Sequence, residues 1–195
     1  MREKIIDLGG SSDPNSIGKR CTVADIKAGR RFYRIMIDCG TEFIREEEVG
    51  AYGVGPDFSF LDDKLIDGAV LTHADTDHSG ALGLLRKSGK LDKNSPIIAT
   101  PQTARLLEFV MRDGERSGNH SFLDTINIMS RRTAVLKPGL CEVLPGLPVL
   151  FEPAGHRPGA ASLGIPIRSG KGVALVSGDM SSRREPRPTI TGRLL

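Results

Sequence analysis

The sequence contains no tryptophan, and aromatic residues make up only 5% of it. Platforms on which the bases of a single-stranded nucleic acid could stack are therefore sparse. The cysteines Cys21, Cys39 and Cys141 are odd in number and form no Cys-x-x-Cys pair, so neither a disulfide framework nor a thiolate zinc knuckle is indicated. No apolar run is long enough to span a bilayer, and the first residues lack the apolar core of a signal peptide. We therefore expect no membrane association and a location in the reducing cytoplasm.

The residues that are present suit one globular domain. With 195 residues, 38% of them hydrophobic and 26% charged, the chain is long enough to bury a sizeable core. Its 23 glycines and 12 prolines favour a sheet-rich fold with many turns over a helical bundle. The net charge of +3 permits a polyanionic substrate but does not argue for one. Basic residues gather in three stretches, which we interpret as solvated loops: Arg30, Arg31 and Arg34; Arg131 and Arg132; Arg183, Arg184 and Arg187.

Hydrophobic patterning predicts many short strands. The first three are expected to form a meander, at residues 5–8, 21–26 and 32–40. Later strands are predicted at residues 65–72, 96–99, 141–144, 149–152, 161–167 and 172–176. This layout indicates an α/β sandwich and not the alternation of a parallel Rossmann sheet.

Fewer segments have a helical pattern. Helices are predicted at residues 79–87, with Ser79 as the N-cap, and at 101–112, with Pro101 in the first turn. A weaker helical pattern follows a polar loop at 113–120 and extends to residue 130, while residues 42–55 are expected to form a loop or a short helix. We expect one domain over residues 1–180 and a basic, proline-containing tail over 181–195.

One turn concentrates groups that bind metals. The sequence His73-Ala-Asp75-Thr-Asp77-His78 directly follows an apolar strand and directly precedes a helix. Side chains at such a turn converge at the carboxyl end of a strand, where sheet folds place their sites. Imidazole nitrogen and carboxylate oxygen together suit zinc, and additional carboxylates make manganese an alternative. The competing interpretation is a turn with solvated acids and an N-capping aspartate.

Further acids and a histidine occupy comparable places. Asp38 ends the strand that contains Ile37, and Asp179 follows the strand that ends at Val176. His156 lies among small residues that permit a close approach of the backbone. Each of these residues alone is compatible with an ordinary turn or loop. With the His73–His78 motif, three strands end in acids or histidines, and this repetition is the signal of a common site.

In this order, the motifs resemble motifs one to four of the metallo-β-lactamase superfamily. The segments ATPQTARLLEFVMRD, EPAGHRPGAASLGI and ALVSGDMSSRREPRP resemble the β-CASP nucleases, a branch that includes RNase J and the cleavage and polyadenylation endonuclease. The resemblance extends over residues 5–188. It implies an αββα sandwich that is incomplete at its C-terminus.

The resemblance also implies roles for individual residues. One divalent metal would be bound by His73, Asp75 and His156. A second would be bound by Asp77 and His78, and Asp179 would bridge the two. Asp38 would orient the ligands and would not itself bind a metal. Asp38 and Asp77 are the candidate catalytic residues. Zinc is the expected metal, with manganese or magnesium as alternatives, and a metal-activated hydroxide would hydrolyse the phosphodiester bonds of RNA or DNA.

The sequence departs from the family pattern in two respects. The position of Asp75 usually carries histidine, and a carboxylate there resembles a domain of bacterial DNA-uptake proteins and favours manganese or magnesium relative to zinc. The β-CASP cassette and the last histidines of the site are also absent, since the only remaining histidine, His120, is interpreted as an ordinary surface residue. We therefore expect the N-terminal part of a longer protein. A small-molecule thioesterase or lactonase and an inactive nucleic-acid-processing scaffold remain alternatives.

Overall fold

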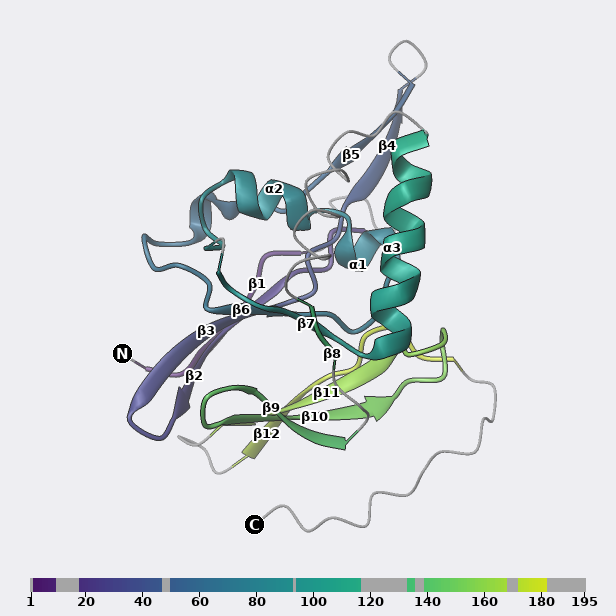
Figure 1. Cartoon of the computed structure of the whole chain (residues 1–195). Helices are drawn as coiled ribbons and strands as arrows, with labels where there is room; N and C mark the ends of the chain where they lie inside the picture. Colours follow the sequence, from purple (N-terminus) through teal and green to yellow (C-terminus); the bar gives the residue numbers. More distant parts are fainter. Residues whose placement is uncertain are drawn as a thin grey trace.

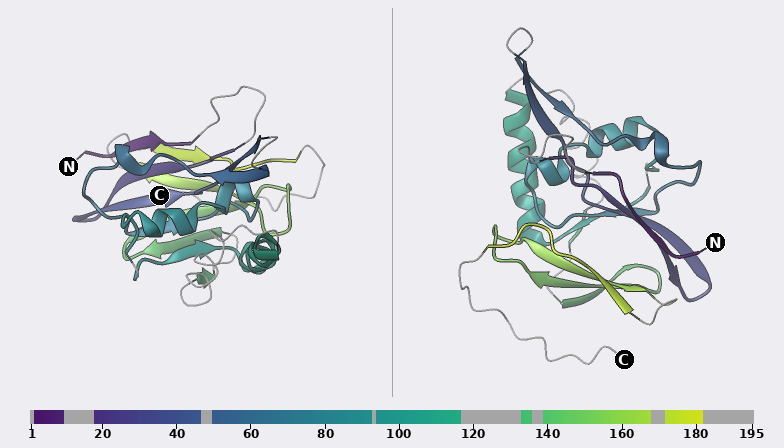
Figure 2. Two further views of the ribbon diagram at one scale, coloured as in Figure 1. Left: turned by 90° about the horizontal axis from the view of Figure 1, so that it is seen from above. Right: turned by 180° about the vertical axis from the view of Figure 1, so that it is seen from behind.

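The computed structural model describes residues 2–9, 18–46, 50–92, 94–116, 133–135, 139–167 and 172–181. Two β-sheets lie face to face, and the described α-helices lie on the outer side of the first sheet (Figure 1). The view from behind shows the same layers of helix, sheet and sheet (Figure 2). The predicted α/β sandwich is therefore confirmed.

The first sheet begins with the predicted meander. Its strands lie in the order β1 (Lys4–Asp7), β2 (Thr22–Ala28), β3 (Arg31–Ile37), β6 (Gly68–Val70), β7 (Ile97–Ala99) and β8 (Thr133–Val135). β1, β2 and β3 pair antiparallel, whereas β3, β6, β7 and β8 are parallel to one another. The carboxyl ends of β3 and β6 consequently meet at the same edge of the sheet.

The second sheet is antiparallel throughout. Its order is β12 (Gly172–Val176), β11 (Ala161–Ile167), β10 (Leu147–Pro153) and β9 (Gly139–Leu144). In the part of the chain that the structure describes, no helix covers the outer face of this sheet, and Leu175 on β12 is 73% exposed. The described layers are therefore the first three of an αββα sandwich.

The strand pattern explains why both faces of the first sheet are buried. Side chains alternate between the faces of a strand. On β2 and β3, Val23 and Met36 pack into the core beneath the helices, while Ile26 and Ile35 pack into the core between the sheets. Burial on both sides makes this sheet a rigid support for residues that follow its strands.

The helices differ from the prediction in one place. The single helix expected over residues 79–87 is two short helices, α1 (Thr76–Ser79) and α2 (Leu82–Lys87). Ser79 does not cap a helix, because its hydroxyl donates to the carbonyl oxygens of Ala74 and Asp75. The helix predicted from Pro101 is confirmed as α3 (Pro101–Arg116), and η1 (Phe58–Phe60) is a short 3-10 turn. None of the described helices is long and apolar enough to cross a membrane.

Two strand regions were not predicted. Residues expected to form a loop or short helix instead form an antiparallel hairpin of β4 (Glu42–Glu46) and β5 (Gly50–Val54). Phe, Ile and Tyr in this segment favour strands, and their preference outweighed the acidic and glycine-rich composition. β8, at residues 133–135, was also not predicted. The weak helical pattern up to residue 130, His120 and most of the tail at 181–195 lie outside the described residues.

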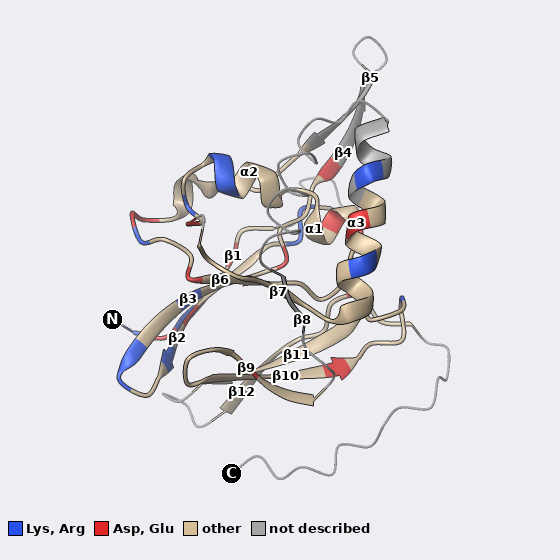
Figure 3. Cartoon of the chain, in the orientation of Figure 1, with Lys and Arg blue, Asp and Glu red and all other residues tan. Residues whose placement is uncertain are grey.

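The interpretation of the first basic stretch as a solvated loop is wrong for Arg34. Arg30 and Arg31 are exposed, but Arg34 is 2% exposed. Its guanidinium donates to both carboxylate oxygens of Asp25, at 2.8 and 2.9 Å, and also pairs with Asp62. Figure 3 shows the other described Lys and Arg residues dispersed over several elements. The other two basic stretches lie outside the described residues.

This ion-pair cluster predicts a loss of stability in acid. Burial favours a raised pKa for Asp25, but the hydrogen bonds and charge of Arg34 hold it below its usual value. Arg34 lowers the pKa of Asp62 to about 2. A depressed carboxylate pKa stabilises the fold above the unfolded value of about 4, and this stabilisation is lost as the pH falls toward the folded pKa. We therefore expect the free energy of unfolding to fall between about pH 4 and pH 2.

Urea titrations across that pH range test this expectation. The slope of unfolding free energy against pH should be smaller in Asp62→Asn than in wild type. Asp63→Asn is the matched control, because Asp63 is exposed and adjacent in sequence. Equal slopes for the two variants would contradict the prediction.

Candidate metal centre

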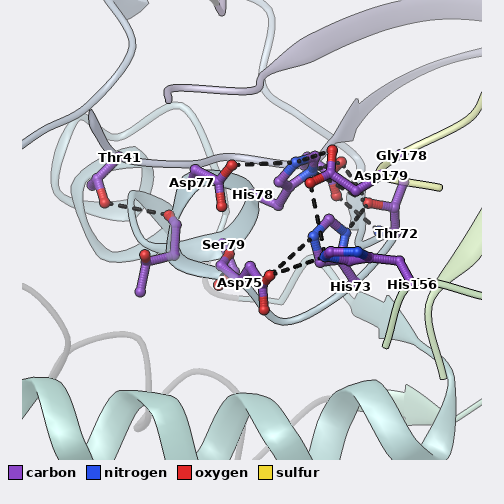
Figure 4. A network of polar contacts seen from close by, with 12 residues as sticks. Thr41, Thr72, His73, Asp75, Asp77, His78, Ser79, His156, Gly178 and Asp179 are labelled. Atoms are coloured by element: carbon purple, nitrogen blue, oxygen red, sulfur yellow. Dashed lines mark hydrogen bonds and ion pairs between the residues drawn. The ribbon is translucent and has the colours of Figure 1, made fainter. Parts of the chain in front are cut away.

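The candidate residues lie where strands of both sheets end. Asp38 follows β3, His73 follows β6 after two residues, and Asp179 lies beyond the end of β12. His156 lies in the loop that connects β10 to β11. The two sheets are joined at this edge, because the amide of Ala161 donates to the carbonyl of Thr72 at 2.9 Å. Figure 4 shows the side chains of His73, His156 and Asp179 directed toward one another.

A hydrogen-bond network around Asp38 sets the orientation of His78. The carboxylate of Asp38 accepts from the amide of Thr72 at 2.8 Å, from its hydroxyl at 2.7 Å, and from Nδ1 of His78 at 2.7 Å. Because a carboxylate only accepts, Nδ1 of His78 carries the proton, and Nε2 of the neutral ring keeps its lone pair. Burial lowers the pKa of His78, but the hydrogen bond and charge of Asp38 outweigh burial and raise the pKa above its usual value.

Thr72 sets the tautomer of His73 in the same way. The Thr72 hydroxyl has one proton, which it donates to Asp38, so toward Nδ1 of His73 at 3.0 Å it accepts. Nδ1 of His73 then carries the proton and Nε2 is free to bind a ligand. Burial, followed by repulsion from His78, lowers the pKa of His73 and keeps its ring neutral near pH 7.

The side chains form two compact groups of donor atoms. His73, Asp75 and His156 make one group, and His73, His78 and Asp179 make the other. Within each group the ligand atoms lie within 4.8 Å of one another. Asp179 lies between the groups, with one oxygen 3.3 Å from Nε2 of His78 and the other 3.8 Å from Nε2 of His156. These positions are compatible with the bridging role that the sequence suggested for Asp179.

Asp77 lies at the margin of the second group. Its carboxylate is 3.6 Å from Nε2 of His78, but it belongs to neither compact group. The structure therefore brings all six candidate ligands into one neighbourhood and places five of them in the two groups. The five are His73, Asp75, His78, His156 and Asp179.

Asp75 does not act as a simple helix cap. It occupies the N-cap position of α1, yet its side chain makes no capping hydrogen bond. Its carboxylate instead accepts from Nε of Arg157 and lies 3.3 Å from Nε2 of His156. Burial favours a raised pKa for Asp75, but the hydrogen bonds from Arg157 and His156 hold it below the usual value. These contacts disfavour the interpretation of the motif as a turn with solvated, capping acids.

Backbone contacts hold the His73–His78 turn against the end of β3. The amide of Cys39 donates to the carbonyl of His78 at 2.7 Å, and the amide of Ala81 donates back to Cys39 at 2.8 Å. Gly40, the residue after Cys39, packs so closely against this turn that an added Cβ would lie 1.5 Å from the carbonyl oxygen of Asp77. The position of the turn therefore depends on a residue without a side chain.

A second close approach fixes the loop that contains His156. The carbonyl of Gly159 accepts from the hydroxyls of Thr100 and Thr103 at 2.7 and 2.9 Å, which ties the loop to the beginning of α3. A pocket of about 390 Å³ lies beside His156 and Arg157 on this side. A smaller pocket of about 200 Å³, bordered by Arg20, lies on the side of Asp38 and His78. Both pockets give access to the candidate ligands.

Sequence reasoning missed two residues of this network. Thr72 was assigned only to a strand, although it lies between Asp38 and both histidines of the motif. Arg157 was quoted next to His156 without a role, because its partner Asp75 is 82 positions away in sequence. Adjacency to predicted ligands was the only signal that the sequence offered for either residue.

Comparison with known proteins shows the family to which the chain belongs. The family model of the metallo-β-lactamase superfamily matches residues 33–193 of this chain. The chain belongs to the metallo-β-lactamase superfamily. The crystal structure of unliganded yeast PDE1 has a similar fold, with a TM-score of 0.53 and 20% identity over 93% of this chain and 66% of that one. The αββα class predicted from the sequence is thus confirmed.

Two ribonucleases are similar in sequence. Ribonuclease TTHA0252 of Thermus thermophilus is 33% identical over 80% of this chain and 35% of its own length. Ribonuclease J of Mycolicibacterium smegmatis is 29% identical over 95% of this chain and 30% of its own length. The predicted resemblance to β-CASP ribonucleases is therefore confirmed as distant homology over most of the chain. The chain spans about a third of the length of these curated relatives.

Proposed function

We propose that this superfamily hydrolase uses divalent metal ions at the described site to cleave phosphodiester bonds of RNA. Two imidazole nitrogens carry the proposal. Nε2 of His73 and Nε2 of His78 are buried, and neither has a hydrogen-bond partner among the described residues. Buried polar atoms without a partner are rare in folded proteins and call for an explanation. Metal ions held together with the neighbouring carboxylates would satisfy both nitrogens.

The donor set fits such ions. One ion would be held by His73, Asp75 and His156, and a second by His78 and Asp77, with Asp179 shared. Mixed nitrogen and oxygen donors suit zinc, and the carboxylate of Asp75 also makes manganese or magnesium acceptable. When bound, the ions would supply the Lewis acidity that activates water and stabilises charge on a phosphate.

The protein's own part is to orient these donors. Asp38 and Thr72 hold the protons of His78 and His73 on Nδ1, so that both Nε2 atoms face the site. The low pKa of His73 keeps one of these donors neutral near pH 7. The rigid ends of β3 and β6 reduce the reorganisation that binding requires.

RNA is the proposed substrate because both ribonuclease relatives align over 80% or more of this chain. Charge supplies no separate argument, since the net charge is only +3. Exposed Arg20 borders the smaller pocket and Arg157 borders the larger one, so a phosphate backbone that crosses the site would meet a cation on either side.

The test compares three substrates. The purified chain, loaded with zinc or with manganese, is assayed on a labelled single-stranded RNA, a DNA of the same sequence and a chromogenic thioester. We expect cleavage of RNA that a chelator abolishes. Asp77→Asn should reduce both bound metal and cleavage, the latter by at least about 100-fold, because an orienting partner alone is worth about 10- to 100-fold. Asp63→Asn should retain both.

Other outcomes would replace the proposal. Turnover of the thioester alone would indicate a small-molecule hydrolase of the same fold. A higher kcat/KM on DNA than on RNA would contradict the choice of substrate. Protein that binds no metal and is unchanged by Asp77→Asn would indicate a non-catalytic scaffold.

A further inference from the structure

Arg157 contacts the one candidate ligand that departs from the family pattern. Its Nε lies 2.9 Å from one carboxylate oxygen of Asp75 and 3.0 Å from the other. Arg157 adjoins His156 in sequence, and its side chain is 55% exposed, whereas that of Asp75 is 23% exposed. The cation therefore lies on the solvent side of the carboxylate, and the histidines lie on the inner side.

The two oxygens of Asp75 have different surroundings. Nε of Arg157 lies 2.9 Å from Oδ1 and donates a hydrogen bond to Oδ2 at 3.0 Å. Oδ2 lies 3.3 Å from Nε2 of His156 and 3.7 Å from Nε2 of His73. The hydrogen bond from Arg157 therefore holds Oδ2, the oxygen that faces the two imidazoles. A single oxygen presented in this way resembles the single donor atom of an imidazole.

The charge balance of the site also supports a role for Arg157. The carboxylates of Asp75, Asp77 and Asp179 give the candidate ligands one more negative charge than a site with histidine in place of Asp75 would have. The guanidinium of Arg157 is always protonated and cancels one of these charges. Asp75 and Arg157 together therefore have the net charge of a neutral imidazole.

We propose that Arg157 is a positioning residue that lets Asp75 replace a histidine ligand. It neutralises the additional charge and orients the carboxylate so that Oδ2 faces the two imidazoles. The loop that carries Arg157 is anchored at Gly159 by Thr100 and Thr103, so its position does not depend on a ligand. This inference rests on the metal centre of the proposed function, although it does not depend on RNA as the substrate.

A double-mutant cycle on zinc affinity tests the proposal. Zinc affinity is measured by competition with a chromophoric chelator for wild type, Arg157→Ala, Asp75→His and the double variant. With Asp75 present, Arg157→Ala should weaken zinc binding by about 10-fold, the size expected when an orienting partner is lost. In the Asp75→His background, the cation has no carboxylate partner and opposes the metal, so Arg157→Ala should leave affinity unchanged or increase it.

The two effects of Arg157→Ala must differ by about tenfold or more between the backgrounds, the full effect of an orienting partner. A smaller difference overturns the proposal, because a general structural role would weaken binding equally in both. The unfolding midpoint of the metal-free variants reports whether the protein accommodates histidine at position 75. If it does not, Asp75→Asn serves as the second uncharged background. Arg112→Ala is the matched control, since Arg112 is 66% exposed and pairs with Glu108 on α3.

The cycle also separates this inference from the proposed function. If wild type binds zinc but the coupling falls short of that threshold, only the role of Arg157 fails. If wild type binds neither zinc nor manganese, the metal centre and the role of Arg157 both fail. Coupling at or above the threshold in a protein that does not cleave RNA supports Arg157 and rejects only the substrate.

Discussion

Asp38→Asn is expected to lower the rate of hydrolysis by about 10⁴-fold, the effect seen when an imidazole is held in the wrong tautomer. An asparagine amide in this place would donate to Nδ1 of His78 and move the ring proton to Nε2. A protonated Nε2 cannot bind a metal. Zinc affinity should fall as well, by at least about 10- to 100-fold, and chelator competition measures it without reference to any substrate.

The same substitution preserves the shape of the buried side chain. Asn can still accept from the amide of Thr72, so the fold should persist and circular dichroism should match that of wild type. Asp63→Asn, an identical change on an exposed aspartate, controls for the loss of one negative charge. Wild-type zinc affinity in Asp38→Asn would show that the network does not set the tautomer of His78.

Gly40→Ala is expected to destabilise the fold by about 4 kcal/mol or more, at the upper end of single-substitution effects. The added Cβ would lie 1.5 Å from the carbonyl oxygen of Asp77, 2.0 Å from its carbon and 2.6 Å from the amide nitrogen of His78. These are backbone atoms, so no change of rotamer relieves the overlap. The turn must move away from β3 and take Asp77 and His78 with it.

Urea denaturation of the metal-free protein measures this effect, and zinc affinity reports the displacement of the ligands. Gly172→Ala is the matched control, because a Cβ there meets nothing within 4 Å. Its free energy of unfolding should remain within about 0.5 kcal/mol of wild type, as for ordinary surface substitutions. A similar small change in Gly40→Ala would mean that the turn yields without strain.

How far the sequence predicted the fold depended on the length and regularity of each segment. The alternation in β2 and β3 predicted buried strands, and Pro101 marked the beginning of α3. The hairpin of β4 and β5 was missed because local composition and strand propensity disagreed there. Arg34 was assigned to solvent because its sequence neighbours are basic, whereas its partner Asp25 lies on the adjacent strand.

The candidate ligands were predictable for a comparable reason. His73, Asp75, Asp77 and His78 lie within six positions, so their convergence is local and readable from spacing alone. The sequence also predicted Asp38 and Asp179 at the ends of strands and His156 among small residues. It did not predict the distances among them, because those depend on the packing of one sheet against the other.

The sequence by itself determined the types of donor, their order along the chain and the family to which they belong. Only the tertiary structure decided which nitrogens of His73 and His78 face the site, because Asp38, which follows a different strand, contacts both the Thr72 hydroxyl and His78. It also decided that Asp75 is paired with Arg157, which lies 82 positions away. Spacing along a chain predicts contacts within a turn, whereas charge compensation and tautomer choice act across space, between residues that folding brings together.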